Sequence, residues 1–142
     1  MEVYLEDMNR DNHPDVLLLD DPPHRYKSRN LFVFNPESVS LISVPEFAQL
    51  GATYTIGNLF YSYITCGCAD ECWESILFRI DSTKIVNLAR QGCDCYNFTV
   101  SVLLGQENKI VEIKKCPSFG FNAKHQSIES KWKGIISSYK IN

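Results

Sequence analysis

Apolar and polar residues alternate over short stretches of this chain, which predicts β-strands rather than long helices. The longest alternation covers residues 54–64, where aromatic and β-branched residues are separated by small polar ones, and we interpret it as one half-buried strand. Two pairs of apolar runs predict β-hairpins, because each pair flanks a four-residue turn sequence. The first pair is residues 75–80 and 85–88 around Asp-Ser-Thr-Lys, and the second is residues 98–104 and 109–113 around Gly-Gln-Glu-Asn.

Two shorter segments, residues 31–34 and 119–123, each predict a further strand. Residues 126–138 are long enough for a helix, but Gly134 and the two isoleucines that follow it favour a strand equally. The pattern as a whole predicts a mostly β, antiparallel fold with little helix.

The first 30 residues are acidic and show no sustained periodicity, so we interpret residues 1–30 as a flexible lead-in and residues 31–142 as one β domain. The N-terminus lacks the apolar core of a secretory signal. No apolar run approaches the roughly 20 residues of a membrane-spanning helix. We therefore expect a cytosolic protein in a reducing compartment, where disulfides are rare.

Charge is unevenly distributed along the chain, whose net charge is −3. Residues 1–50 contain nine acids and four bases, whereas residues 106–142 contain three acids and seven bases. The basic surplus of the last third fits either a solvated, lysine-rich surface or attraction to an anionic membrane. No aromatic-basic RNA motif or recognition helix accompanies it, so we expect no nucleic acid as a partner.

Five of the six cysteines lie between positions 66 and 95, in the spacings Cys-x-Cys, Cys-x₃-Cys and Cys-x-Cys. A structural zinc site usually shows Cys-x-x-Cys pairs, which are absent, and we predict no metal ligands. No histidine stands at the spacing of a cysteine nucleophile and its base, so an enzyme is not expected. Buried, inert cysteines, a metal site and acylation of surface cysteines such as Cys93 and Cys95 remain open.

Several motifs in order resemble the phospholipid scramblase family over about residues 45–138. They are Tyr-Thr-Ile-Gly-Asn at 54–58, the cysteine cluster that begins at Cys66, the run from Phe-Arg-Ile-Asp to Cys-Asp-Cys at 78–95, Cys-Pro-Ser-Phe-Gly-Phe at 116–121, and Ser-Lys-Trp-Lys-Gly-Ile at 130–135. Pro-Glu-Phe-Ala-Gln-Leu at 45–50 is a fainter match to the opening of that family.

The resemblance implies an antiparallel tubby-like barrel around a C-terminal hydrophobic helix, and calcium-stimulated movement of phospholipids between membrane leaflets. Neither that hydrophobic helix nor the acidic calcium segment is present here, so we expect an incomplete barrel and no certain cofactor. Acylated Cys93 and Cys95 would then hold the chain at the cytoplasmic face of a membrane, as a lipoprotein with palmitate chains. Cys66, Cys68 and Cys72 would be structural.

In some members the region matching residues 128–136 is linked to nuclear import. The resemblance thus implies that Lys131, Trp132 and Lys133 contact a membrane surface or an import partner, which leaves the nucleus open as a second location. Expected partners are a phospholipid membrane and other proteins, and a homo-oligomer stays open. Two alternative functions remain: a non-transporting, membrane-associated interaction module and a small cysteine-rich zinc-binding protein.

Overall fold

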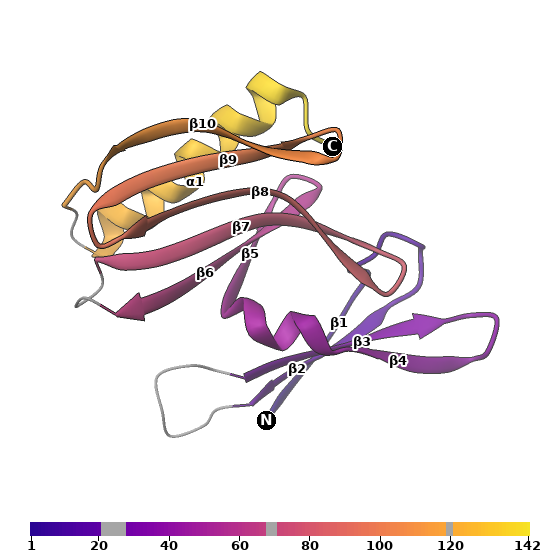
Figure 1. Cartoon of the computed structure of the whole chain (residues 1–142). Helices are drawn as coiled ribbons and strands as arrows, with labels where there is room; N and C mark the ends of the chain where they lie inside the picture. The colour runs from indigo at the N-terminus through magenta and orange to yellow at the C-terminus, as the bar shows by residue number, and fades with distance from the viewer. Residues whose placement is uncertain (21–27, 68–70, 119–120) are drawn as a thin grey trace. The chain divides into compact units, whose positions relative to one another are not determined.

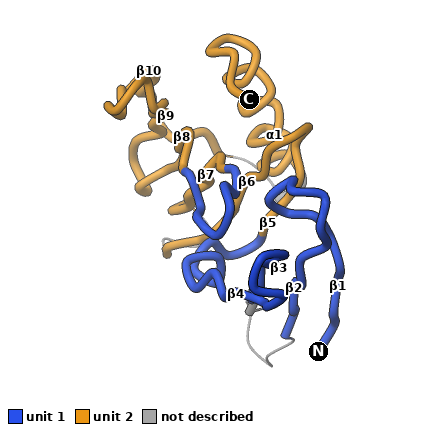
Figure 2. The backbone as a smooth tube through the Cα atoms, turned by 90° about the vertical axis from the view of Figure 1, so that its right-hand side faces the viewer, with its two compact units in different colours: residues 1–52, 79–86 blue, residues 53–78, 87–142 orange. Residues whose placement is uncertain are grey.

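A computed structural model describes residues 1–20, 28–67, 71–118 and 121–142 of the chain. These residues form two antiparallel sheets, one 3₁₀ helix and one α-helix (Figure 1). The predicted fold class, mostly β and antiparallel with little helix, is confirmed. The chain divides into two compact units, coloured separately in Figure 2: unit 1 comprises residues 1–52 and 79–86, and unit 2 comprises residues 53–78 and 87–142.

Unit 1 contains a four-stranded sheet in which sequential strands are neighbours, in the order β1-β2-β3-β4. A 3₁₀ helix, η1, follows the last strand and packs against β3. The bounds are β1 Glu2–Glu6, β2 Asp15–Asp20, β3 Ser28–Asn35, β4 Ser40–Val44 and η1 Pro45–Leu50.

One face of the four-stranded sheet is closely packed. Leu31, Val33 and Val44 lie on it, and Phe47 of η1 is equally buried. The prediction of a flexible lead-in over residues 1–30 is therefore wrong for β1 and β2, which are regular strands of this sheet. The apolar run Val-Leu-Leu-Leu in β2 pairs with β3 over residues 16–19, so its side chains alternate between the two faces of the sheet.

Unit 2 contains a six-stranded antiparallel sheet in the order β10-β9-β8-β7-β6-β5 (Figure 1). Both predicted hairpins are confirmed, since β7 pairs with β8 and β9 with β10, and residues 79–86 at the tip of the β7–β8 hairpin cluster with unit 1. The bounds are β5 Ala52–Ile56, β6 Leu59–Gly67, β7 Cys72–Asp81, β8 Lys84–Asp94, β9 Asn97–Leu104 and β10 Glu107–Lys115.

The interpretation of residues 54–64 as one strand is wrong. The chain turns at Gly57 and Asn58, and this turn separates β5 from β6. Gly57 has φ = +57°, a left-handed conformation that glycine adopts without a Cβ penalty. A Gly-Asn pair between two apolar runs is a hairpin signal, and it outweighs the continuous alternation.

The helix α1, Phe121–Tyr139, covers one face of the six-stranded sheet through Ile128, Trp132 and Ile135, which are buried. The indole Nε1 of Trp132 donates to Ser75 Oγ at 2.9 Å. The helical alternative for residues 126–138 is thus confirmed, and the predicted strand at 119–123 is wrong from residue 121 onward, positions 119 and 120 being outside the described residues.

The six-stranded sheet remains open rather than closing into a barrel, because among the described strands β10 and β5 stand at its two edges. Helix α1 is amphipathic: apolar residues face the sheet, and Lys133 on its outer side is exposed. The helix that covers this sheet, α1, is therefore not the hydrophobic C-terminal helix of a tubby-like barrel.

Candidate metal centre

The connection between β1 and β2 in unit 1 has an unusual arrangement of oxygen-bearing side chains. Its sequence, Asp-Met-Asn-Arg-Asp-Asn-His-Pro-Asp at 7–15, places Asp7, Asn9, Asp11 and Asp15 at loop positions 1, 3, 5 and 9. Those positions carry side-chain oxygen ligands, directly or through water, in the EF-hand calcium loop. The spacing therefore matches the first nine positions of a loop that wraps around a hard cation, whereas position 12, a bidentate glutamate in the EF-hand, is Leu18 in this chain.

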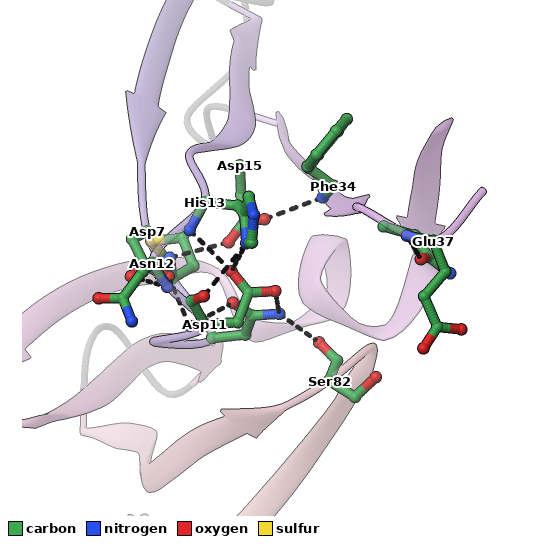
Figure 3. Close-up of polar contacts among 11 residues, drawn as sticks. Asp7, Asp11, Asn12, His13, Asp15, Phe34, Glu37 and Ser82 are labelled. Atoms are coloured by element: carbon green, nitrogen blue, oxygen red, sulfur yellow. Dashed lines mark hydrogen bonds and ion pairs between the residues drawn. The ribbon is translucent and has the colours of Figure 1, made fainter. Parts of the chain in front are cut away.

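The backbone of loop 7–15 winds tightly around the Asp7 carboxylate (Figure 3). Asp7 accepts hydrogen bonds from the main-chain N–H groups of Asp11, at 3.1 Å, and Asn12, at 2.9 Å. Asn12 occupies position 6, where an EF-hand has glycine, and its φ is +69°. Arg10 is also left-handed, with φ = +62°. Asparagine tolerates this conformation better than most residues do, so it can replace the glycine here.

Asp11 lies at the centre of the loop's hydrogen bonds. Its carboxylate accepts from the main-chain N–H of His13 at 2.9 Å and from the side-chain amide of Asn9 at 3.0 Å. Burial acts to raise the pKa of Asp11, but these hydrogen bonds and the neighbouring His13 ring outweigh it and hold the pKa below its ordinary value. The Asp11 side chain is therefore a carboxylate at neutral pH, ready to bind a cation.

Asp15 ends the loop and is fully buried. Its two carboxylate oxygens accept from the main-chain N–H groups of Met8, at 2.8 Å, and Phe34, at 2.9 Å. Burial is the largest influence on the pKa of Asp15 and, with the charge of Asp11, raises it despite those hydrogen bonds. No basic side chain among the described residues forms an ion pair with Asp15. A buried carboxylate beside a second carboxylate is stabilised by a cation.

The loop is not preassembled as a cage of acidic side chains, since no group of three His, Cys, Asp or Glu in the described parts of the chain is arranged to hold a metal. Calcium sites differ from such cages because amide and main-chain carbonyl oxygens make up much of the ligand set. Each carboxylate oxygen keeps a second lone pair beside its N–H donor. To bind an ion, the Asn9 side chain would turn its amide oxygen, in place of its NH₂ group, toward Asp11. The His13 ring, whose Nδ1 lies 3.1 Å from the main-chain carbonyl oxygen of Asp11, would move away from that oxygen.

The cysteines predicted as acyl acceptors are disulfide-bonded. Cys93 is only 3% exposed and bonds to Cys116, with their Cα atoms 5.8 Å apart. Cys95 is also in a disulfide. Cys66, expected to be structural, bonds to Cys72, with a Cα separation of 5.1 Å, while Cys68 lies outside the described residues. No described cysteine is free, so Cys93 and Cys95 have no thiolate to acylate in this state.

The predicted membrane-surface residues on α1 have protein partners instead. Trp132 is fully buried against Ser75 and cannot reach a membrane surface in this structure. Lys131 Nζ donates to Glu112 Oε2 at 2.7 Å, and Lys133 Nζ lies 3.3 Å from Glu129 Oε1 on the same helix. Only Lys133, whose side chain is 67% exposed, faces solvent broadly.

No calcium ligand in loop 7–15 is predicted above, since residues 1–30 are interpreted there as an acidic lead-in. The signal was present in the printed sequence as Asp-x-Asn-x-Asp-x-x-x-Asp. In an acidic lead-in carboxylates need no explanation beyond solvation, so the spacing does not stand out by itself.

No protein-family model matches this chain, and no curated protein matches it. Among solved structures, its fold is similar to one described as "Structure of a Xanthomonas Type IV Secretion System related protein", with a TM-score of 0.60 and 18% sequence identity. The match covers 78% of this chain and 57% of that one, so it extends over little more than half the length of its structural relative. At this identity the similarity establishes the fold alone. None of the described helices is long and apolar enough to cross a membrane.

Proposed function

We propose that this chain is a calcium-binding, disulfide-stabilised β protein of an oxidising compartment, and that it acts as a binding module rather than as an enzyme. The observation that carries the proposal is the spacing of Asp7, Asn9, Asp11 and Asp15 in a loop that already wraps around the Asp7 carboxylate. Within that set, the buried carboxylate of Asp15 has no basic partner among the described residues, which also favours a cation.

Calcium fits this loop better than magnesium or zinc. The side chains at the ligand positions offer carboxylate and amide oxygens, whereas zinc prefers thiolate sulfur and imidazole nitrogen. By the EF-hand register, the main-chain carbonyl of His13 would add the ligand of position 7. The ligands lie on an irregular loop, which suits the flexible six- to eight-fold coordination of Ca²⁺ and not the rigid octahedron of Mg²⁺.

The disulfides support the proposal of an oxidising compartment. Cys66–Cys72, Cys93–Cys116 and the disulfide of Cys95 persist only where thiols are not continuously reduced. Calcium modules of extracellular environments bind with a Kd of roughly 0.1–1 mM, and we expect that range here. This proposal replaces the expectation of a reducing compartment, which was based on the first residues of the sequence alone.

Isothermal titration of the metal-stripped chain with CaCl₂ tests the function directly. We expect one site per chain in the stated range, and its loss in the double variant Asp7→Asn/Asp11→Asn. Asp81→Asn is the matched control, because Asp81 is an exposed acid of the same unit whose carboxylate pairs with Arg79. Absence of heat and of any calcium-induced rise in melting temperature would refute the proposal, as would equal binding by the double variant.

Lipid scrambling, and acylation of Cys93 and Cys95, stay predictions for a reduced form of the chain. Hydroxylamine-sensitive acyl labelling separates the two views: we expect no label on the oxidised protein. Labelling that is lost in Cys93→Ser/Cys95→Ser would favour the tethered, lipid-associated function instead.

A further inference from the structure

The strand β10 stands at one edge of the six-stranded sheet of unit 2, with β9 on one side only. All of its residues except Glu112 are exposed. Within the residues that the structure describes, no main-chain hydrogen bond reaches β10 from any strand other than β9. An open edge of this kind presents a row of N–H and C=O groups that can pair with another extended chain.

A groove of about 560 Å³ lies between β10 and the helix α1, which runs along the same part of the sheet (Figure 1). Val100 of β9 and Ile135 of α1 give it apolar walls. Gly134 also lines it, and a Cβ at that position meets nothing within 4 Å, so the space beside the helix is open. The volume is that of an ordinary ligand site. The other small residues that α1 contributes to the groove are Ser127, Ser130 and Ser138.

A β-bulge in β10 connects the open edge to the groove. The pairing with β9 shifts its register between Ile110 and Glu112, so Val111 is the extra residue. Val111 and Glu112 both line the groove, which shows that the bulge directs both side chains toward α1. Residues 112–115 follow the bulge in regular register and form the uninterrupted part of the edge beside the groove.

The charged side chains of the groove leave it positive. Lys114 and Lys131 are opposed there by Glu112 alone. Lys131 Nζ donates to Glu112 Oε2 at 2.7 Å, and Lys114 Nζ lies 3.4 Å from Glu112 Oε1. Both ammonium groups also lie over the Phe98 ring, 5.1 Å and 5.7 Å from its centroid, which holds them at one place. Two cations that share one carboxylate attract a second carboxylate.

We propose that the open edge of β10 and the adjoining groove bind an extended, acidic peptide segment of another protein, which adds a strand to this sheet. The edge selects a polypeptide, because another extended backbone carries N–H and C=O groups at the matching spacing. Lys114 and Lys131 select acidic side chains on the face of the peptide that points into the groove. The inference goes beyond calcium binding, which belongs to unit 1, and does not depend on it.

Fluorescence anisotropy with the full chain and the labelled peptide acetyl-Val-Glu-Val-Glu-Val-amide measures the binding. In a strand, alternate residues face the same side, so both glutamates can point into the groove. We expect saturable binding, and at least tenfold weaker binding of the peptide that has lysine in place of glutamate.

Two N-methylated forms of the acidic peptide test strand addition, one methylated at the valine nitrogens and one at the glutamate nitrogens. Alternate amides of a strand point in opposite directions, so one form loses the donors that face β10 and the other does not. We expect one form to lose binding and the other to keep it.

Variants of the chain test the groove. Gly134→Leu fills it at a position where a Cβ meets no atom, and we expect loss of peptide binding with the fold retained. Ser137→Leu is the matched control, because Ser137 is an exposed residue of the same helix outside the groove. Lys114→Glu should weaken binding at least tenfold, whereas Lys84→Glu, an exposed position outside unit 2, should not. Circular dichroism shows that each variant is folded.

Hydrogen exchange locates the bound peptide: we expect slower exchange in residues 112–115 and no change in β5, the opposite edge of the sheet. Three results would overturn the proposal. The first is no binding of the acidic peptide up to millimolar concentration. The second is equal binding by both N-methylated forms and the parent peptide, which would reduce the interaction to charge attraction. The third is slow exchange of residues 112–115 without peptide that becomes faster on dilution, which would make a second copy of the chain the occupant of this edge.

Discussion

The carboxylate of Asp15, the first residue of β2, accepts a hydrogen bond from the main-chain N–H of Phe34 in β3, 19 residues away. The same carboxylate accepts from Met8, which is buried. One side chain thus ties the start of the candidate calcium loop to its end and to the neighbouring strand β3. A substitution that removes the two carboxylate oxygens leaves the main-chain N–H groups of Met8 and Phe34 without acceptors.

We therefore predict that Asp15→Ala lowers the free energy of unfolding by about 1–3 kcal/mol in metal-free buffer, the usual cost of unsatisfied buried donors. Urea denaturation monitored by circular dichroism measures it, since both tryptophans lie in unit 2. Asp81→Ala, which breaks an exposed ion pair with Arg79, should cost less than about 1 kcal/mol. Equal losses in the two variants would contradict the role assigned to Asp15.

Alanine substitutions at Gly92 and Gly134 should change the stability of the protein in opposite directions. A Cβ at Gly92 would lie 2.5 Å from the main-chain oxygen of Trp73, so Gly92→Ala forces β8 away from β7 and should destabilise by about 1–3 kcal/mol. A Cβ at Gly134 meets nothing within 4 Å, and helix propensity predicts that Gly134→Ala stabilises by about 0.5–1 kcal/mol. Thermal and urea unfolding of both variants gives the comparison.

The two mapped disulfides should differ in their contribution to stability. Cys93–Cys116 closes a loop of sequence separation 23, whereas Cys66–Cys72 closes one of 6. Chain-entropy arguments give about 3 kcal/mol for the longer loop and about 2 kcal/mol for the shorter one. We predict this order for the double alanine variants in urea unfolding under oxidising conditions. The reverse order would indicate that packing around the sulfurs, not loop closure, dominates.

The ion pair between Glu112 and Lys131 should make a small part of the stability depend on pH. The hydrogen bond from Lys131 is the largest influence on the pKa of Glu112 and holds it below the ordinary value of 4.5. A carboxyl whose folded pKa is depressed stabilises the fold above its unfolded pKa, and this contribution is lost as the pH falls through the folded pKa.

The stability difference between the wild type and Glu112→Gln should thus be present at neutral pH, begin to shrink as the pH falls past about 4.5, and disappear below the depressed pKa of the folded carboxyl. Because both side chains are about one-third exposed, its size should stay under about 1 kcal/mol. Urea unfolding at a series of pH values measures it, and a difference that persists at acid pH would contradict the assignment to this pair.

Local patterns were sufficient to predict the hairpins of unit 2, because Asp-Ser-Thr-Lys and Gly-Gln-Glu-Asn carry their turn chemistry within four residues. The same kind of signal was misjudged at Gly57, where a continuous alternation concealed a two-residue turn. The helix around Trp132 could not be chosen over a strand from propensity alone, since burial against Ser75 decided it.

The sequence by itself determined that this is a mostly β, antiparallel chain, and it also contained the oxygen spacing of loop 7–15. Only the tertiary structure decided the state of the cysteines, because disulfide pairing depends on Cα positions brought together from distant strands, as in Cys93 and Cys116. It also decided that Asp15 is buried while Val3 and Leu5 of β1 remain exposed. Burial is a property of what packs against a strand, and no local stretch of sequence specifies that neighbour.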